Sequence, residues 1–274
     1  MLLCFMWLLG FCSSSTGVPV SSTNGAASAS GNASTLSIVD LFPAANQTSE
    51  VGALTSESEV SNVSSETLEE LQLDLPLDEG DIILTEDRNA VSRVWKNAVV
   101  PYIISPEMAH RTADIEKAFK MITSSTCVRF KDRTDEANYL YIRTSKGCAS
   151  YIGCLGGSQS VYFADACSVG NICHELVHAL GLHHEHNRQD RDLYISVKWT
   201  HIAPDQKKNF EIKRGDLLDL PYDLGSIMHY GTSYFSIDGS PTIVSKDSRR
   251  RIGQRSHLSK LDIKKLNALY HCSK

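Results

Sequence analysis

Three histidines at fixed spacings constrain this chain more strongly than its other sequence features. His174 and His178 are four residues apart, so on an α-helix both imidazoles share one face and can bind one ion. Gly181 can adopt a left-handed conformation, which would end the helix and let His184 supply a third nitrogen. Three neutral nitrogen ligands leave an open position for water, as in catalytic zinc sites. Glu175 is placed to take a proton from that water, so the sequence predicts one catalytic Zn²⁺.

Charge is divided unevenly along the chain. Residues 1–87 contain 13 acidic residues and no Lys or Arg, whereas residues 88–274 contain 27 basic and 19 acidic residues, a net charge of +8. This division predicts an acidic leader and a basic body that attract each other. The alternative is a solvated acidic tail with no specific role.

The N-terminus predicts export. Residues 1–12 form an apolar run that is too short to span a bilayer and is followed by small residues, which is typical of a signal peptide, here residues 1–17. We therefore expect a secreted, extracellular protein with no transmembrane segment. Six cysteines follow residue 17, and an even number in a secreted chain indicates disulfides, although six allow fifteen connectivities. Glycosylation sequons occur at Asn32, Asn46 and Asn62.

Residues 18–88 are expected to be an acidic, glycosylated and largely disordered propeptide, because their few apolar side chains cannot offset the entropy of ordering. Arg88 is the first basic residue of the chain and stands in an acidic stretch. The bond from Arg88 to Asn89 is therefore an expected cleavage site for an activating trypsin-like protease. The catalytic domain would then span residues 89–274.

Hydrophobic periodicity in the body predicts an α+β fold, with strands and a helix first and further helices after them. Ser259 and Asp262 fit a capping box at the start of the last helix. The expected strands are residues 99–104, 139–142 and 160–163, and the expected helices are residues 106–124, 171–181, 205–213 and a last helix from about 259.

The motifs of the body resemble those of one protease family. The run from His174 to Asp192 reads HELVHALGLHHEHNRQDRD and resembles the astacin signature HExxHxxGxxHExxRxDRD within the metzincins. The segments SIMHY (226–230) and IGQR (252–255) are also similar to astacin segments, so the resemblance covers residues 89–272. It is strongest to vertebrate hatching-enzyme-like members. It implies a two-lobed catalytic domain with a mixed sheet and a zinc-binding active-site helix.

The resemblance implies roles for residues outside the histidine motif. Met228 would form an apolar turn beneath the zinc. Tyr230 would be a resting zinc ligand that moves away to stabilise the oxyanion. Glu185 would bind the new N-terminus at Asn89. Arg255 would favour an acidic residue just after the scissile bond, although it could also be a solvated cation beside three neighbouring arginines.

Part of the leader also resembles the family. Astacin-like zymogens carry an FxGD-like segment, and Glu79-Gly80-Asp81 is similar to it. Asp81 would then occupy the position of the zinc-bound water, because a carboxylate is an acceptable zinc ligand. Asp78 stands where the family usually has an aromatic residue. The alternative is that Asp81 is one more acid in an acidic run.

The family resemblance also bears on the cysteines. It implies the pairs Cys127–Cys272 and Cys148–Cys167, and it leaves Cys154 and Cys173 as a third expected pair. A cysteine as zinc ligand is the rival interpretation, but the side chain of Cys173 should point away from the face that His174 and His178 share.

Together these features predict a secreted zinc endopeptidase made as a zymogen. Its expected partners are protein or peptide substrates and the activating protease, with no nucleic acid. An inactive protease fold that serves as a secreted binding protein is the alternative, and a zinc hydrolase acting on other bonds is a third interpretation. Retention of Glu175, Tyr230 and the three histidines favours the enzyme, since a binding protein needs no proton shuttle.

Overall fold

A computed structural model of the chain describes residues 77–84 and 93–272. Backbone contacts divide the chain into residues 1–58 and 59–274, and all described residues belong to the second unit. The predicted signal peptide, the three sequons, Arg88 and Asn89 lie outside the described residues. Within the described ranges, no helix has the length and apolar character needed to cross a bilayer.

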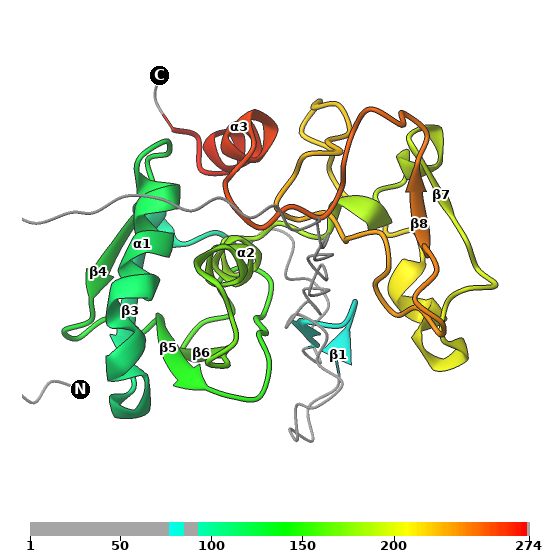
Figure 1. The fold of residues 1–274 in the computed structure, drawn as a ribbon. Coiled ribbons are helices and arrows are strands. Elements are labelled where there is room, and N and C mark those ends of the chain that lie inside the picture. Colours follow the sequence, from blue (N-terminus) through cyan, green and yellow to red (C-terminus); the bar gives the residue numbers. More distant parts are fainter. Residues whose placement is uncertain (1–76, 85–92, 273–274) are drawn as a thin grey trace, which may run out of the picture. The chain divides into compact units, whose positions relative to one another are not determined.

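A four-stranded sheet with the order β4-β3-β5-β6 forms the first part of the body (Figure 1). Its strands are β3 (Val99–Ile104), β4 (Arg129–Asp132), β5 (Tyr139–Thr144) and β6 (Ser158–Phe163). All three strand pairs are parallel, with Tyr102 opposite Leu140 in the central pair. An antiparallel bridge between Ala149 and Tyr162 extends the sheet beyond β6, so the sheet is mixed at this edge.

Three α-helices accompany the sheet, namely α1 (Thr112–Thr123), α2 (Val169–Ala179) and α3 (Lys260–Leu269). Helices α1 and α2 pack against each other and against the sheet. Alternating strand residues such as Leu140, Ile142 and Val161 are buried beneath them, because successive strand residues point to opposite faces. The disulfide Cys127–Cys272 ties the end of α3 to this core. Residues 93–182 together with α3 are called the sheet lobe.

Residues 183–258, called the loop lobe, contain little regular structure. The strands β7 (Ile195–Val197) and β8 (Ile243–Ser245) form an antiparallel pair. Short 3-10 helices span Glu185–Asn187, Arg191–Leu193 and Pro204–Phe210. The lobe has its own cluster of buried apolar residues, which are Ile195, Ile202, Phe210, Tyr222, Tyr230, Phe235 and Ile243.

Residues 77–84, called the leader segment, form a hairpin of β1 (Leu77–Asp78) and β2 (Ile82–Ile83). The N–H of Ile83 donates to Ser150 O at 2.8 Å, and the N–H of Ser150 donates to Asp81 O at 3.0 Å. The leader segment is therefore hydrogen-bonded to the edge of the sheet lobe.

Two predicted helices differ from the observed ones. The range 106–124 divides into a 3-10 helix, Pro106–Arg111, and α1, because the backbone of Arg111 is non-helical (φ −100°, ψ 3°). The Arg111 guanidinium donates to the carbonyls of Ala164 and Asp165, which holds it in that conformation. The range 205–213 is observed as the 3-10 helix Pro204–Phe210.

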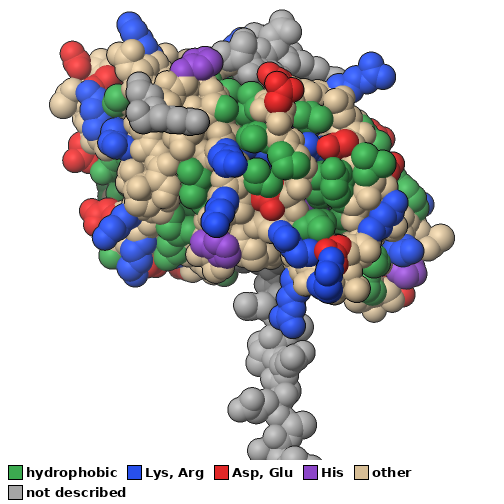
Figure 2. All heavy atoms as spheres, turned by 90° about the horizontal axis from the view of Figure 1, so that it is seen from above, with side chains coloured by type: hydrophobic (Ala, Val, Ile, Leu, Met, Phe, Trp, Pro, Cys, Tyr) green, Lys and Arg blue, Asp and Glu red, His purple; other side chains and the backbone are tan. Residues whose placement is uncertain are grey.

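Basic side chains are spread over the body. On the face in Figure 2, Lys and Arg side chains lie among exposed apolar and acidic ones. Between the leader segment and the body, Lys213 pairs with Asp78 at 2.8 Å and Lys208 donates to Leu77 O at 3.3 Å. The predicted attraction between leader and body therefore includes a specific ion pair.

Candidate metal centre and active site

Helix α2 carries three of the predicted site residues. The hydroxyl of Ser168 accepts a hydrogen bond from the backbone at the third position of the helix, which completes a capping box. His174, Glu175 and His178 are fully buried on this helix. The chain leaves the helix at Gly181, whose φ of +112° is the left-handed conformation that its place in the motif predicted.

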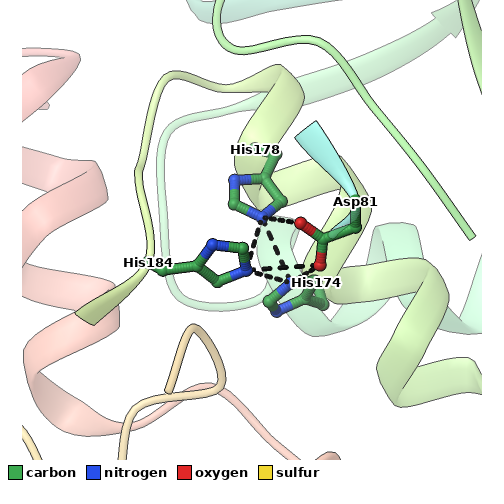
Figure 3. Close-up of side chains that lie close together, drawn as sticks. All are labelled: Asp81, His174, His178 and His184. Carbon is green, nitrogen blue, oxygen red and sulfur yellow. Dashed lines mark hydrogen bonds and ion pairs between the residues drawn. The ribbon is translucent and has the colours of Figure 1, made fainter. Parts of the chain in front are cut away.

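The Nε2 atoms of the three predicted histidines converge on one point (Figure 3). They are separated by 3.1 Å for His174 and His178, 3.2 Å for His178 and His184, and 3.3 Å for His184 and His174. The turn after α2 thus brings His184 to the same face as the two helical ligands, as the spacing predicted.

The other ring nitrogen of each histidine identifies the tautomer. The Nδ1 atoms of His174 and His178 lie 2.9 and 2.7 Å from the carbonyl oxygens of Ile227 and Leu182, and oxygens of this kind can only accept. Nδ1 of each ring is therefore the donor, and when the ring is neutral Nε2 carries a lone pair. Lone pairs that face one another at about 3 Å need a cation between them.

The carboxylate of Asp81 completes the cluster. Its Oδ2 lies 3.2 Å from Nε2 of both His174 and His184. Its Oδ1 is buried, has no hydrogen bond and lies 3.7 Å from Nε2 of His178. The leader segment therefore places Asp81 among the three histidines, where the resemblance placed the inhibitory ligand.

Electrostatics at the cluster favour a bound cation. Burial alone would raise the pKa of Asp81, but the adjacent imidazoles, His184 foremost, hold it well below its usual range. Burial alone would lower the pKa of His184, but the carboxylates of Asp81 and Glu79 raise it to about 9. Burial and the two neighbouring imidazoles lower the pKa of His178. The two carboxylates thus stabilise positive charge at this position, whether a proton or a metal ion carries it.

The four side chains fit a zinc ion. Ligand atoms about 2.0–2.1 Å from one ion at tetrahedral angles are about 3.3–3.4 Å apart. The observed Nε2 and Oδ2 separations of 3.1 to 3.3 Å agree with that arrangement, and Oδ1 of Asp81, which has no hydrogen bond, faces the same point. Three nitrogens and one oxygen are a donor set that zinc accepts.

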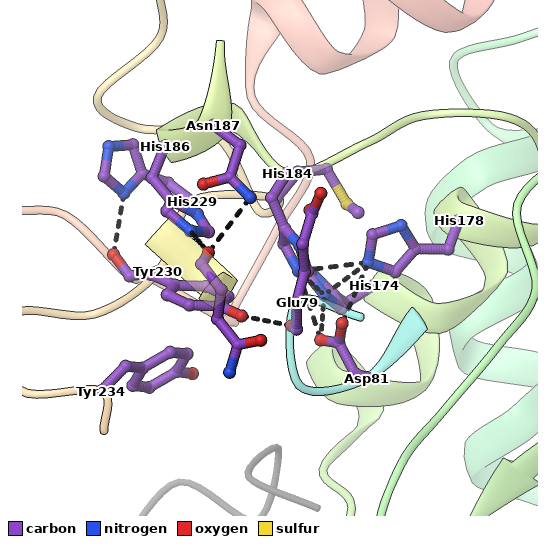
Figure 4. Close-up of polar contacts among 12 residues, drawn as sticks. Glu79, Asp81, His174, His178, His184, His186, Asn187, His229, Tyr230 and Tyr234 are labelled. Carbon is purple, nitrogen blue, oxygen red and sulfur yellow. Dashed lines mark hydrogen bonds and ion pairs between the residues drawn. The ribbon is translucent and has the colours of Figure 1, made fainter. Parts of the chain in front are cut away.

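Tyr230 lies beside the cluster but is bonded to the leader segment (Figure 4). Its hydroxyl donates to the carbonyl oxygen of Glu79, and its ring packs edge-on against His184 at 4.8 Å. The ring of His186 stacks on the ring of Tyr230 at 3.7 Å, and its Nε2 lies 3.0 Å from Asn209 O. Buried rings therefore hold Tyr230 within reach of the metal position while the leader segment engages its hydroxyl.

Met228 lies in the turn that supports the ligands. It is buried, its N–H donates to the hydroxyl of Ser226, and its carbonyl accepts from the N–H of Glu185. The preceding carbonyl, that of Ile227, accepts from His174. The turn therefore connects two elements of the site through backbone hydrogen bonds.

Glu185 is a buried carboxylate with three partners. Lys265 of α3 forms an ion pair with its Oε2, and Oε1 is 3.2 Å from Arg188 and accepts from Asp223 N at 2.7 Å. Burial raises the pKa of Glu185, and the two cations oppose that rise. Asn89, its predicted partner, lies outside the described residues, so the predicted pairing stays a prediction.

Arg255 lies next to the tyrosines of the loop lobe. Its guanidinium donates to His229 O at 2.9 Å and to Tyr234 Oη at 3.5 Å. Its backbone abuts the first turn of α2, since a Cβ on Gly170 would be only 1.7 Å from Arg255 O. The first turn of the metal-binding helix therefore fixes the position of the loop that carries Arg255.

The cysteines agree with two of the three expected pairs. The structure contains the disulfides Cys127–Cys272 and Cys148–Cys167, whereas Cys154 and Cys173 are buried free thiols, so the prediction of a third disulfide is wrong.

The reason lies in helix α2. The N–H of Gly153 donates to His178 O, which fixes Cys154 near the end of α2. Cys173 lies five residues before His178 on this helix, about one and a half turns away, while the N–H of Cys154 donates to Arg93 O, so backbone hydrogen bonds hold Cys154 beside a different part of the helix.

Sequence reasoning missed the contacts of two charged residues. The Glu79 carboxylate is 2.7 Å from Nδ1 of His184, and Lys265 neutralises Glu185. The sequence does contain an indication for Glu79, because it is a second carboxylate separated from Asp81 only by Gly80. Lys265 carried none, since it is one of several lysines on a C-terminal helix.

Comparison with known proteins gives a family for this site. Residues 87–271 match the sequence model of the astacin peptidase family. The chain is 41% identical over 224 residues to the zinc metalloproteinase nas-14 of Caenorhabditis elegans, a match that covers 76% of this chain and 44% of nas-14. The chain therefore spans less than half the length of that relative.

Two further similarities concern a hatching enzyme. High choriolytic enzyme 1 of Oryzias latipes is 39% identical over 209 residues, which cover 71% of this chain and 77% of the relative. The solved structure of this hatching enzyme zinc-protease matches with a TM-score of 0.63 and 36% identity, over 70% of this chain and all of that chain. The α+β fold is thus the fold of that enzyme.

Proposed function

Since the chain belongs to the astacin family of zinc metalloproteases, we propose that it is a zinc-dependent endopeptidase of extracellular proteins, made as a zymogen. The observation that carries this proposal is the convergence of three histidine nitrogens, two of them on the helix α2 that also carries the buried Glu175. His174, His178 and His184 would hold one Zn²⁺, and the family relationship names the metal.

The mechanism assigns one task to each side chain. Zinc, when bound, would polarise a peptide carbonyl and favour ionisation of a water molecule. Glu175 would accept the proton of that water and return it to the leaving amine. The hydroxyl of Tyr230, which reaches Glu79 O in the precursor, would instead donate a hydrogen bond to the developing oxyanion. Met228 would support the site through its turn.

Latency would come from the leader segment. Asp81 lies among the histidines and would exclude the water, while Glu79 O engages Tyr230. Tyr230 would become a resting ligand once the leader segment has left. The proposed chain organisation is a signal peptide at residues 1–17, a propeptide at 18–88 glycosylated at Asn32, Asn46 and Asn62, and a catalytic domain at 89–274.

Activation would follow cleavage between Arg88 and Asn89 by a trypsin-like protease. A cavity of about 180 Å³ next to Glu185, lined also by Arg188, Lys265 and Leu269, supports the proposal that the new N-terminus docks there. The buried carboxylate of Glu185 would then gain the ammonium of Asn89 as a further partner.

The test starts from the purified secreted precursor. After limited treatment with trypsin and its removal, the chain should digest casein, lose this activity to a zinc chelator and regain it with added Zn²⁺. N-terminal sequencing should give Asn89. A folded, processed and zinc-loaded chain that digests no protein or peptide would reject the endopeptidase and favour the alternative, a secreted binding protein.

Peptide-library profiling of the activated enzyme tests the proposed preference for an acidic residue just after the scissile bond. We expect Arg255→Gln to lower the preference for Asp and Glu at that position about tenfold or more, because the ion pair between the half-buried guanidinium and the substrate carboxylate would be lost. Arg251→Gln, an exposed arginine on the same loop, is the matched control. Equal profiles for all three proteins would remove this role from Arg255.

A further inference from the structure

The three candidate zinc ligands differ in the hydrogen-bond acceptor that their Nδ1 atoms contact. His174 and His178 donate through Nδ1 to the carbonyls of Ile227 and Leu182, both part of the body. His184 donates through Nδ1 to the carboxylate of Glu79, at 2.7 Å, in the leader segment. One of the three supporting acceptors therefore comes from the part of the chain that activation would remove.

A carboxylate supports a metal ligand more strongly than a carbonyl does. It carries a full charge, so its hydrogen bond to an imidazole N–H is stronger and makes the opposite nitrogen a better electron donor. Glu79 and His184 are 1% exposed, so water neither screens nor replaces this contact. Hydrogen bonds of this type typically change metal affinity by about 10–100-fold.

The turn of the leader segment brings two of its three carboxylates, those of Glu79 and Asp81, to the same metal site (Figure 4). Glu79 and Gly80 have positive φ values of 51° and 80°, which reverses the chain between Glu79 and Asp81. A Cβ on Gly80 would lie 2.7 Å from the ring of Phe235, so only glycine fits between the hairpin and the loop lobe. Glu79 thereby contacts Nδ1 of His184, while Asp81 contacts the Nε2 atoms that face the metal position.

We propose that Glu79 is a positioning residue that orients His184 and strengthens zinc retention in the precursor. The leader segment would then hold the metal from two sides, through Asp81 directly and through Glu79 behind His184. This inference rests on the proposed zymogen function. Its consequence is that the leader segment protects the metal site from loss of zinc, in addition to blocking it.

The test measures zinc release from the full-length precursor. All proteins carry Glu175→Gln to prevent self-processing, and release into excess chelator is followed with a colorimetric zinc indicator. Glu79→Gln keeps the shape and an acceptor but removes the charge, and it should release zinc about tenfold faster or more. Release at the rate of the parent protein would overturn the proposal.

A matched control is available in the same hairpin. Asp78→Asn also removes one carboxylate from the leader segment, but its partner is Lys213 and it touches none of the histidines. We expect its zinc release to stay within about twofold of the parent. If Asp78→Asn accelerates release as much as Glu79→Gln, the effect is general weakening of leader docking and the proposal is wrong.

A spectroscopic readout separates positioning from docking. In histidine-labelled precursor, the ring Nδ1–H signal of His184 should shift in Glu79→Gln, whereas those of His174 and His178 should stay, because their acceptors are carbonyls of the body. Circular dichroism melting verifies that each variant is folded. Equal shifts at all three rings, or none, would contradict the specific contact.

Asp81→Ala with Glu175 intact distinguishes this inference from the function on which it rests. If Asp81→Ala stays inactive and retains zinc like the parent, the zymogen proposal fails. If Asp81→Ala digests casein but Glu79→Gln retains zinc like its parent, latency stands and only the role of Glu79 fails. Support for both proposals requires activity in the first variant and faster zinc release in the second.

Discussion

The two lobes build the site in different ways. The sheet lobe supplies His174, Glu175 and His178 from α2, whose position is fixed by a capping box and by the packing of its apolar residues in the main core. The loop lobe supplies His184, Tyr230 and the loop of Arg255 from segments with almost no regular structure.

Buried polar groups take the place of regular structure in the loop lobe. Arg191 is 3% exposed and donates to the carbonyls of His186 and Phe210, which ties the 3-10 helices together. Asn187 Nδ2 also donates to Asn209 O, at 3.2 Å. Because a buried donor without an acceptor costs about 1–3 kcal/mol, such a network specifies geometry as strictly as a helix does.

The comparison shows that the spacing of the histidines along the chain and the contacts that orient them are determined separately. Helical spacing places His174 and His178 locally, whereas the loop side of the site depends on contacts between residues far apart in sequence. Substitutions on α2 should therefore change chemistry or local stability, and substitutions in the loop lobe should change geometry and pH response.

The largest effect is expected on the sheet-lobe side of the site. Glu175→Gln should lower kcat for peptide hydrolysis by about 10²–10⁴-fold, since the amide cannot carry the proton. Zinc content should be unchanged because the ligands are untouched. Activity of a few per cent or more in pure, processed protein, measured with a fluorogenic peptide, would break the assignment of Glu175.

Tyr230→Phe tests the loop-lobe side. It removes one donor to the oxyanion and should lower kcat of the processed enzyme by about 10²–10³-fold, with little change in KM. Steady-state kinetics measure the split. The control is Tyr234→Phe, a neighbouring ring 4.7 Å away, and equal losses in both variants would contradict a specific role for Tyr230.

Acid should destabilise the loop lobe through His229. Burial lowers the pKa of His229 to about 4, against 6.5 for an ordinary histidine, and its Nε2 accepts from the Tyr222 hydroxyl at 2.7 Å. Between these pH values the unfolded chain binds a proton that the folded chain excludes. The neutral form of His229 therefore contributes fully to the free energy of unfolding above pH 6.5. This contribution is lost as pH falls towards 4, and the loss is on the order of 3 kcal/mol.

Urea unfolding at several pH values measures this loss. His229→Gln should lose less free energy of unfolding than the parent between pH 6.5 and 4, because the amide does not titrate. His110→Gln, an exposed histidine of the sheet lobe, should follow the parent curve. Parallel curves for the parent and His229→Gln would show that His229 does not govern the acid response.

The smallest effect concerns the start of α2. Ser168→Ala removes the N-cap and should lower the free energy of unfolding by about 1 kcal/mol, with kcat changed less than threefold. Ser124→Ala, at an exposed helix end, should change stability by less than about 0.5 kcal/mol. A large loss of kcat in Ser168→Ala would mean that the sheet-lobe side of the site is less rigid than its packing indicates.

Local rules predicted the parts of this structure that depend on near neighbours. The convergence of His174 and His178 follows from a four-residue spacing, and the cap by Ser259 and Asp262 follows from a three-residue spacing. The chain reversal at Gly181 follows from its freedom at positive φ. In each case one turn of backbone determines the contact.

Contacts across the sequence were not predictable in the same way. Glu79 and His184 are 105 residues apart, and only the folded hairpin brings them together. Pairing Cys154 with Cys173 failed because the sequence does not reveal that Cys154 is anchored at the far end of α2. The 3-10 helix Pro204–Phe210 also depends on tertiary contacts, since Arg191 binds its last carbonyl.

The contact between Gly170 and the carbonyl of Arg255 has a consequence for altering cleavage preference. The backbones of Gly170 and Arg255 are in direct contact there, so the loop leaves no space for a methyl group at position 170. Any redesign of residues 249–256 would have to preserve this backbone contact. Otherwise α2, which carries His174 and His178, would shift. Under the role proposed for Arg255, one backbone contact would thus link cleavage preference to the position of the helix that carries His174 and His178.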